Sequence, residues 1–271
     1  MIVLVTGCRS GFGLLIAVAA ARAGHTVYAG LRDLETRGDL EAAAAGLPVI
    51  PVQLDVCDPE QRRAVVERIV AEHGRIDALV NNAGIALGGF IEQLGEDELR
   101  RVFEVNVFAA WALMRDVLPH LRAQRSGVIV NISSMAGRGA MPGLGGYAAS
   151  KHALEGMSEA LRHEMRPFGV RVVLVEPGPY KTDIFSRNRR IAAAVSDSGP
   201  YAAMQEKVEA VFANAEFGDA QEVADLVTRL LVDPNPRLRY PLGPRVRARV
   251  WMERLLPFEA RAKVIKKIVG F

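Results

Sequence analysis

The sequence predicts an α/β fold built on a doubly wound parallel sheet, and three observations predict it. Short runs rich in β-branched residues alternate with longer helical stretches from Ile2 to Val175. The runs are apolar at nearly every position, which is typical of strands buried on both faces of a sheet. A glycine-rich turn separates the first run from the first helical stretch. Because alternation of this kind favours right-handed βαβ units, we expect a Rossmann-like arrangement with flanking helices.

The pattern places the strands and helices of this sheet in order along the chain. Strands are expected at residues 2–5, 26–30, 49–54, 78–80, 127–132 and 170–175. Helices are expected between them at residues 12–23, 59–73, 96–123 and 147–166. Gly7 ends the first run and Gly24 ends the first helical stretch, and glycine is a common boundary residue.

The pattern loosens after Gly178. The segment that follows mixes aromatic, basic and alanine-rich pieces and contains no clean strand, and we interpret residues 178–216 as a loop over the substrate. A helix is then expected at residues 219–232 and a short strand at residues 238–240.

Residues 245–271 form a basic tail that is helical in composition and interrupted at Pro257. We expect the tail to cover the substrate cleft or to pack on a sister subunit. Contact with an anionic membrane surface is the less favoured alternative. Because no linker, repeat or low-complexity stretch marks a boundary, one domain is expected over residues 1–271.

The composition excludes several classes of protein. Half of the 271 residues are hydrophobic and 24% are charged, which excludes a disordered chain. The 34 Lys and Arg residues barely exceed the 31 Asp and Glu residues, so no nucleic-acid partner is expected. The longest apolar stretch, residues 11–21, is shorter than the roughly 20 residues that span a bilayer. Since the opening also lacks a basic leader segment, we expect a cytoplasmic protein.

Cysteine and histidine give no sign of a disulfide framework or a metal site. Cys8 and Cys57 are the only cysteines, which suits a reducing compartment. The five histidines show neither H-x-x-x-H spacing nor cysteine partners, so no metal is expected.

The turn after the first strand carries glycines in a G-x-x-x-G-x-G pattern. Three glycines there permit a tight turn, close approach of a pyrophosphate and close packing of helix on strand. The N-terminus of the following helix offers free N–H groups and a positive dipole end to such an anion. The candidate cofactor-binding residues of this turn are Gly7, Arg9, Ser10, Gly11, Phe12 and Gly13.

Further motifs follow in a fixed order. Asn82-Ala83-Gly84 comes after the fourth strand, Tyr147-x-x-x-Lys151 opens a helix, and Pro177-Gly178 with Thr182 follows the sixth strand. With the glycine turn, this combination resembles the short-chain dehydrogenase/reductase family, over the chain as far as Gly243. The wording Thr-Gly-Cys-x-Ser-Gly-Phe-Gly is most similar to members that act on steroids, retinoids and other apolar alcohols.

The resemblance implies a set of cofactor contacts beyond the glycine turn. These are Asp55, Val56, Asn82, Ala83, Gly84, Tyr147, Lys151, Pro177, Gly178 and Thr182. Asp55 suits a turn residue or helix cap before Pro59 equally well.

The end of the second strand selects between NAD(H) and NADP(H). An acidic side chain there would accept hydrogen bonds from the ribose 2′-hydroxyl of NAD, but Leu31 occupies the position. Arg32 follows, and a guanidinium suits a 2′-phosphate and stacks on adenine. Arg9 adds a second positive charge, whereas Asp33 lies one residue too far along. We therefore predict that NADP(H) is favoured over NAD(H), the alternative being that Arg32 is a solvated surface charge.

Tyr147 and Lys151 lie one helical turn apart on the same face. A free tyrosine has a pKa near 10, and a nearby ammonium is expected to lower that pKa toward the working range. The resemblance implies that Tyr147 exchanges a proton with the substrate oxygen and that Lys151 holds the nicotinamide ribose. Without its context, the same spacing suits an exposed surface pair.

Ser134 and Asn106 complete the implied catalytic set. The resemblance selects Ser134 to hydrogen-bond the substrate oxygen, and Ser133 is expected to bond the backbone of its turn. Asn106 matches an asparagine that bends its helix and holds a water in line with the lysine. Thr182 matches the residue that bonds the nicotinamide carboxamide, and it also suits a helix N-cap.

These parts predict an NADP(H)-dependent oxidoreductase that interconverts a hydrophobic secondary alcohol and its ketone or aldehyde. The loops beyond the strand ends are rich in apolar residues such as Met135, Tyr180 and Ile184, some of which could instead fill the core. The alternative is a catalytically silent NADP(H)-binding sensor or regulatory protein. The resemblance further implies a homodimer or homotetramer that pairs through the helices at 96–123 and 147–166.

Overall fold

The computed structural model describes residues 1–182, 184 and 189–270. Residues 183 and 185–188, which fall within the predicted substrate loop, and residue 271 lie outside the described part of the chain. Everything below refers to the described residues.

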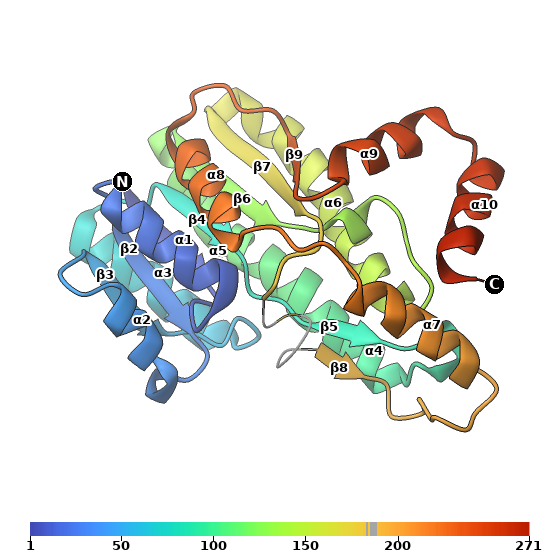
Figure 1. The fold of residues 1–271 in the computed structure, drawn as a ribbon. Coiled ribbons are helices and arrows are strands. Elements are labelled where there is room, and N and C mark those ends of the chain that lie inside the picture. The colour runs from blue at the N-terminus through green and yellow to red at the C-terminus, as the bar shows by residue number, and fades with distance from the viewer. Residues whose placement is uncertain (183, 185–188, 271) are drawn as a thin grey trace.

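Seven parallel strands form one sheet in the order β3-β2-β1-β4-β6-β7-β9 (Figure 1). The strands are β1 (Ile2–Thr6), β2 (Thr26–Leu31), β3 (Val49–Gln53), β4 (Ala78–Asn81), β6 (Gly127–Ile132), β7 (Val170–Pro177) and β9 (Arg239–Leu242). This confirms the predicted doubly wound sheet, and the predicted strand positions agree with it to within two residues. The strand order reverses between β1 and β4, which is where open α/β sheets bind their ligands.

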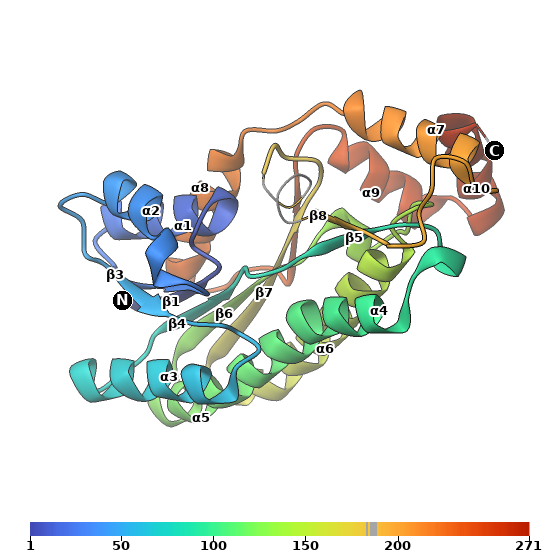
Figure 2. The same cartoon turned by 90° about the horizontal axis from the view of Figure 1, so that it is seen from below.

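Helices cover both faces of the sheet, as Figure 2 shows. On one face lie α1 (Gly11–Arg22), α2 (Gly38–Ala43) and α8 (Ala220–Val232), and on the other lie α3 (Pro59–His73), α5 (Ala109–Gln124) and α6 (Gly145–Met165). Each face has its own buried apolar cluster. Ile16 and Val223 belong to the first cluster, and Val66, Leu113 and Leu161 belong to the second.

The helix predicted at residues 96–123 is interrupted. It consists of α4 (Glu96–Phe103), a π-helical segment η3 (Glu104–Phe108) and then α5. Asn106 lies in the middle of the π segment, where its amide Nδ2 donates to the Ile85 carbonyl at 2.9 Å and to Ser150 Oγ at 3.0 Å. Its Oδ1 accepts from the Ile85 amide at 2.9 Å. These bonds give a physical reason for a polar residue inside the helix, and they accompany the predicted local bend.

The segment after β7 is more ordered than the sequence predicts. A short strand, β8 (Arg189–Ile191), pairs in parallel with β5 (Ala86–Gly88), and α7 (Ala202–Ala213) follows. The expectation of no strand there is wrong, because three residues are too few to show a period and the partner β5 is distant in sequence. No helix of the described residues is long and apolar enough to cross a membrane.

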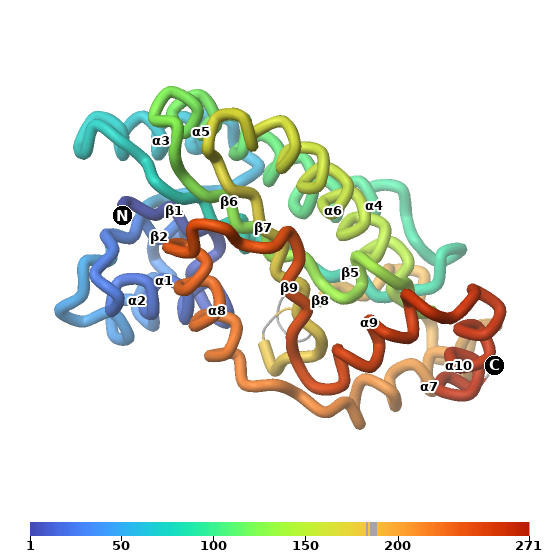
Figure 3. Tube along the Cα trace, turned by 90° about the horizontal axis from the view of Figure 1, so that it is seen from above, coloured from blue at the N-terminus to red at the C-terminus, as the bar shows by residue number. Residues whose placement is uncertain are grey.

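The tail forms two helices that meet at Pro257, as predicted. They are α9 (Val246–Leu255) and α10 (Phe258–Val269). Figure 3 shows α7, α9 and α10 gathered at one end of the molecule, away from the N-terminus, and α10 packs against α7.

Candidate active site

One cleft collects residues that directly follow six of the parallel strands. The predicted site residues that line it are Gly7, Arg9, Ser10, Gly11, Phe12, Arg32, Asp55, Val56, Asn82, Ala83, Gly84, Ser134, Tyr147, Lys151, Pro177, Gly178 and Thr182. Two predicted site residues, Gly13 and Asn106, do not line the cleft. The structure therefore brings together the glycine turn, the Tyr147 helix and the segment after β7 at the carboxyl edge of the sheet.

The glycine turn has a backbone shape that side chains would prevent. Gly7 has a φ of +71° and Gly11 a φ of +56°, which is the left-handed region that favours glycine. A Cβ at Gly13 would overlap the carbonyl oxygen of Gly7 and come within 2.5 Å of Asn82 Nδ2. Gly13 therefore acts by allowing α1 to pack closely, and the turn presents an open cradle at the start of that helix, as a pyrophosphate requires.

Asn82 and Thr6 fix the glycine turn to the end of β4. Asn82 Nδ2 donates to the carbonyl oxygens of Thr6 and Gly7, at 2.8 and 3.2 Å. Thr6 Oγ1 accepts from the backbone amides of Asn82 and Ala83 at 3.0 and 2.9 Å. The amide of Asn82 is thus occupied by the turn itself, so Asn82 shapes the cradle rather than presenting a free donor.

The far end of the cleft carries two arginines and a carboxylate already in use. Arg9 and Arg32 are both exposed and line the cleft. Asp33 Oδ1 accepts from the Glu35 amide at 3.0 Å and so caps a short turn. Asp55 Oδ1 accepts from the Cys57 amide at 2.9 Å. Asp55 therefore acts as a turn residue, and because its position also borders the cleft, its contact with a cofactor stays a prediction.

Ser134 and Tyr147 face each other across the other end of the cleft. Ser134 Oγ accepts from the Ala136 amide at 3.1 Å, and a hydrogen bond between Ser134 and the Tyr147 hydroxyl lowers the pKa of that hydroxyl. Ser133 behaves differently from the prediction: its Oγ is buried and has no hydrogen-bond partner among the described residues. Both serines line the cleft, and Ser134 is the one that hydrogen-bonds Tyr147.

Lys151 is buried and tied to the end of β6. Its side chain is 3% exposed, and Nζ donates to the Ile132 carbonyl at 2.9 Å. Nζ lies 5.8 Å from the centre of the Tyr147 ring, within reach of a cation–π contact. A Cβ at Gly84 would lie 3.8 Å from this Nζ and 3.3 Å from Asn106 Oδ1. Gly84 therefore keeps the space between the lysine and the π segment open.

The acid–base balance of the pair differs from the prediction. Burial raises the pKa of Tyr147 to about 12, and the hydrogen bond from Ser134 only partly offsets this effect. Burial also lowers the pKa of Lys151 to about 8, while the nearby Glu155 carboxylate raises it. The prediction that the ammonium lowers the pKa of the phenol is wrong here, because both groups are desolvated and Nζ is directed to a carbonyl. Tyr147 therefore holds its proton at neutral pH.

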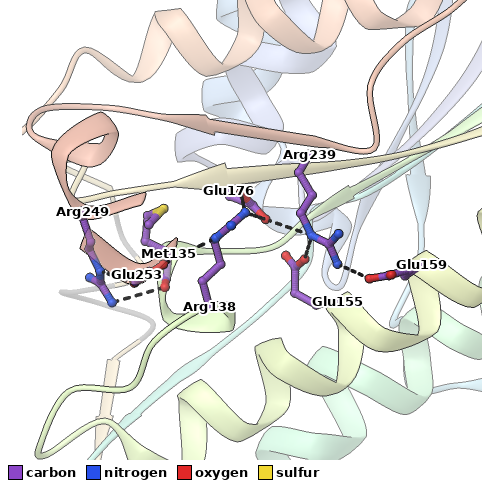
Figure 4. A network of polar contacts seen from close by, with 8 residues as sticks. All are labelled: Met135, Arg138, Glu155, Glu159, Glu176, Arg239, Arg249 and Glu253. Atoms are coloured by element: carbon purple, nitrogen blue, oxygen red, sulfur yellow. Dashed lines mark hydrogen bonds and ion pairs between the residues drawn. The ribbon is translucent and has the colours of Figure 1, made fainter. Parts of the chain in front are cut away.

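Behind the cleft lies an ionic network that the sequence analysis did not anticipate (Figure 4). Glu176, fully buried at the end of β7, accepts from Arg138 Nη1 at 3.1 and 3.2 Å. Arg239 Nε lies 3.5 Å from Glu176 and donates to Glu155 at 2.9 Å. Glu155 lies one helical turn after Lys151 on α6. Burial first, and then repulsion from Glu155, raise the pKa of Glu176 to about 7.

The network also reaches the tail. Arg138 Nε lies 3.5 Å from Glu253 Oε2, and Arg249 Nε donates to Glu253 Oε1 at 3.0 Å. Arg249 Nη2 donates to the Gly139 carbonyl at 2.6 Å. The residues come from five separate segments, so no local motif signals them. Their effect is to fix the segment after Ser134 between β7, α6 and α9.

The segment after β7 borders the cleft in part. Thr182 lies next to the glycine turn, since a Cβ at Gly11 would be 3.4 Å from its Cβ. Tyr180 is buried, its hydroxyl donates to Glu222 at 3.1 Å, and its ring meets Phe12 edge-on. Tyr180 therefore anchors the segment, and it also lines the cleft. Ile184 lines the cleft, whereas Met135 is buried outside its lining.

We predict that Lys151→Met changes how stability depends on pH. The native pKa of Lys151, about 8, lies below its ordinary value of 10.5. The native state therefore binds fewer protons than the unfolded state between these pH values, and wild-type stability rises with pH there. Relative to the variant, the wild type should gain about 1.4 kcal/mol per pH unit in this window.

Urea unfolding at several pH values, from about 7 to about 11, measures this difference, because that range includes both the native and the ordinary pKa of Lys151. Lys263→Met removes an exposed lysine and controls for the loss of a charge. Parallel stability curves for wild type and Lys151→Met would contradict the buried ammonium.

Comparison with known proteins places this geometry in a family. The family model described as short chain dehydrogenase matches residues 1–193. An uncharacterized oxidoreductase of Bacillus subtilis, YusZ, is 37% identical over 98% of this chain and 97% of that protein. A 3-ketodihydrosphingosine reductase of Bacteroides thetaiotaomicron is 34% identical over 90% of this chain and 88% of that protein. Human 17-beta-hydroxysteroid dehydrogenase type 1 is 36% identical over 88% of this chain and 76% of that protein.

Solved structures of similar fold agree with this family assignment. A short-chain dehydrogenase from Streptomyces avermitilis, 35% identical, superposes with a TM-score of 0.84 over 98% of this chain and 95% of that one. A Burkholderia phymatum short-chain dehydrogenase/reductase in complex with NAD is 28% identical, with a TM-score of 0.79 over 93% of this chain and 92% of that one. ElxO with NADP bound is 25% identical, with a TM-score of 0.77 over 91% of this chain and 98% of that one. The chain belongs to the short-chain dehydrogenase/reductase family of oxidoreductases.

Proposed function

We propose that this protein is an NADP(H)-dependent oxidoreductase that interconverts a hydrophobic secondary alcohol and its ketone or aldehyde. One observation carries the proposal: Ser134, Tyr147 and Lys151 meet in the same cleft as the glycine cradle. A proton donor, a hydrogen bond to orient it and a nucleotide cradle are what carbonyl reduction requires in one place.

The residues suggest a division of labour. When bound, the nicotinamide cofactor supplies or accepts the hydride. In reduction, Tyr147 donates its phenolic proton to the carbonyl oxygen, and Ser134 holds that oxygen by a hydrogen bond. With a pKa of about 12, Tyr147 carries its proton at neutral pH and can act as the acid in reduction. In oxidation the phenol must first lose this proton, so the alcohol-oxidising rate should rise at alkaline pH.

The choice of NADP(H) rests on charge at the far end of the cleft. Arg9 and Arg32 are exposed there, and neither has an ionic partner among the described residues. Asp33, the one acid close to the place where NAD-binding proteins use a carboxylate, is engaged with the Glu35 amide. Two guanidinium groups without an ionic partner among the described residues suit a 2′-phosphate.

The choice of a hydrophobic substrate rests on the cleft lining and on the relatives. The cleft lining includes the apolar side chains of Ile85, Val105, Ile132 and Ile184. Relatives that cover most of the chain are named for a hydroxysteroid and a ketosphingosine base. An apolar wall with a few convergent polar groups is typical of a site for an apolar carbonyl compound.

We also propose that the protein is a homodimer or homotetramer. Phe108 and Trp111 are exposed on η3 and α5, on the helices that the sequence selected for pairing. Large exposed apolar side chains on one helix face suit burial against a second copy.

The central experiment follows NADPH oxidation with a panel of aliphatic, aromatic, steroid and retinoid carbonyls. Tyr147→Phe should lower turnover by about a thousandfold, because the phenylalanine has no proton to donate, while NADPH binding stays within about twofold. Tyr240→Phe is the matched control, since that hydroxyl accepts from the Arg237 amide and lies outside the cleft lining.

Turnover of Tyr147→Phe within tenfold of wild type would exclude Tyr147 as the acid. A tenfold loss corresponds to only about 1.4 kcal/mol of activation free energy. Tight NADPH binding without turnover on any carbonyl of the panel would instead favour the sensor function.

Arg32→Ser should weaken NADPH binding by about 10- to 100-fold and leave NADH binding nearly unchanged, because it removes a hydrogen-bonded charge from the 2′-phosphate alone. Arg63→Ser removes an exposed arginine on α3 outside the cleft lining and controls for net charge. Fluorescence titration with both cofactors measures the effect. Equal losses for NADPH and NADH would show that Arg32 does not read the phosphate.

A further inference from the structure

One side of the tail is fastened to the rest of the chain. Arg249 donates to the carbonyls of Gly139 and Met135 at 2.6 and 3.3 Å, and Glu253 pairs with Arg138. Val246 and Val269 are buried at the two ends of the tail. These contacts fix α9 and α10 at the end of the molecule that also carries α7 (Figures 1 and 3).

The other side of the tail presents large apolar side chains to solvent. Trp251 is 66% exposed, and Leu255 and Phe258 are each 67% exposed. Leu256 is 39% exposed. Trp251 and Leu255 lie one helical turn apart on α9, and Phe258 opens α10 directly after the corner. We name Trp251, Leu255, Leu256 and Phe258 the tail patch. Contiguous exposed apolar surface of this kind marks an interaction site.

The tail also carries an excess of positive charge. Exposed basic side chains of the tail with no ionic partner among the described residues are Arg247, Arg254, Lys263, Lys266 and Lys267. The two acids of the tail do not balance them, because Glu253 turns inward to Arg138 and Arg249 and only Glu259 is exposed. The exposed surface of the tail therefore combines an aromatic and aliphatic patch with an excess of positive charge.

We propose that the tail docks the protein onto the surface of an anionic lipid bilayer. The tail patch would enter the boundary between headgroups and acyl chains, and the exposed Arg and Lys side chains of the tail would contact anionic headgroups. A tryptophan beside basic side chains is the composition that this boundary favours.

Charge decides between a bilayer and a second copy of the chain. A symmetric contact through the tail patch would bring two sets of basic side chains together, and like charges across an interface oppose association. An anionic surface instead gains from every one of those charges. The proposal concerns the tail alone and does not depend on turnover at the cleft.

Vesicle binding with the full-length protein tests the proposal. The chain has two tryptophans, so in a Trp111→Phe background Trp251 is the only fluorescent tryptophan. Its emission should shift to the blue and the protein should co-sediment with phosphatidylcholine–phosphatidylserine vesicles, with binding that falls as salt rises. Binding to phosphatidylcholine vesicles should be at least tenfold weaker.

The double variant Leu255→Ser/Phe258→Ser should bind the anionic vesicles at least tenfold more weakly, with an unchanged thermal midpoint. Val232→Ser, at an exposed apolar residue of α8 outside the tail, is the matched control and should bind like the parent. Vesicle binding unchanged in the double variant would overturn the proposal. So would failure of the parent to bind anionic vesicles at low salt, or a dimer that the double variant dissociates without any lipid binding.

Discussion

The buried ammonium of Lys151 is the constraint on which the site depends. Burying a lysine is unfavourable unless its donors are satisfied, and here the Ile132 carbonyl accepts one hydrogen bond while the Tyr147 ring lies within cation–π distance. This arrangement requires α6 to begin close to the end of β6. Once it does, the tyrosine one turn earlier on the helix lies beside Ser134, which follows the same strand. The catalytic geometry is therefore a consequence of how one charged side chain is accommodated.

The ionic network behind the cleft stabilises this placement. Glu155 lies one turn beyond Lys151 on α6 and keeps the ammonium charged by raising its pKa. Arg239 joins Glu155 to the end of β7, and Arg138 joins β7 to the segment after Ser134. Glu253 of the tail also pairs with Arg138. A shift of α9 would therefore move the segment that directly follows Ser134. The tail is thus mechanically connected to the cleft as well as being exposed on its other side.

Local signals predicted much of the molecule. The helix at residues 59–73 was predicted with its bounds, since Asp58 caps it, Pro59 opens it and Gly74 ends it in the left-handed region. The family resemblance implies a bend at Asn106, where the structure has a π-helical segment. What the sequence could not show depends on contacts between distant segments. β8 exists only through its pairing with β5, and the network needs five segments to meet. The pKa of Tyr147 was predicted with the wrong sign, because the spacing shows a neighbouring charge but not how deeply both groups are buried.

We propose that hydride passes between a nicotinamide held in this cleft and an apolar carbonyl compound while Tyr147 supplies the proton. NADPH carrying deuterium in the transferring position of the nicotinamide tests it most directly, with mass spectrometry of the alcohol formed from the best carbonyl of the panel. We expect one deuterium on the carbinol carbon and none on oxygen after exchange with water. An alcohol without deuterium, formed with each stereochemical form of the labelled cofactor, would contradict it.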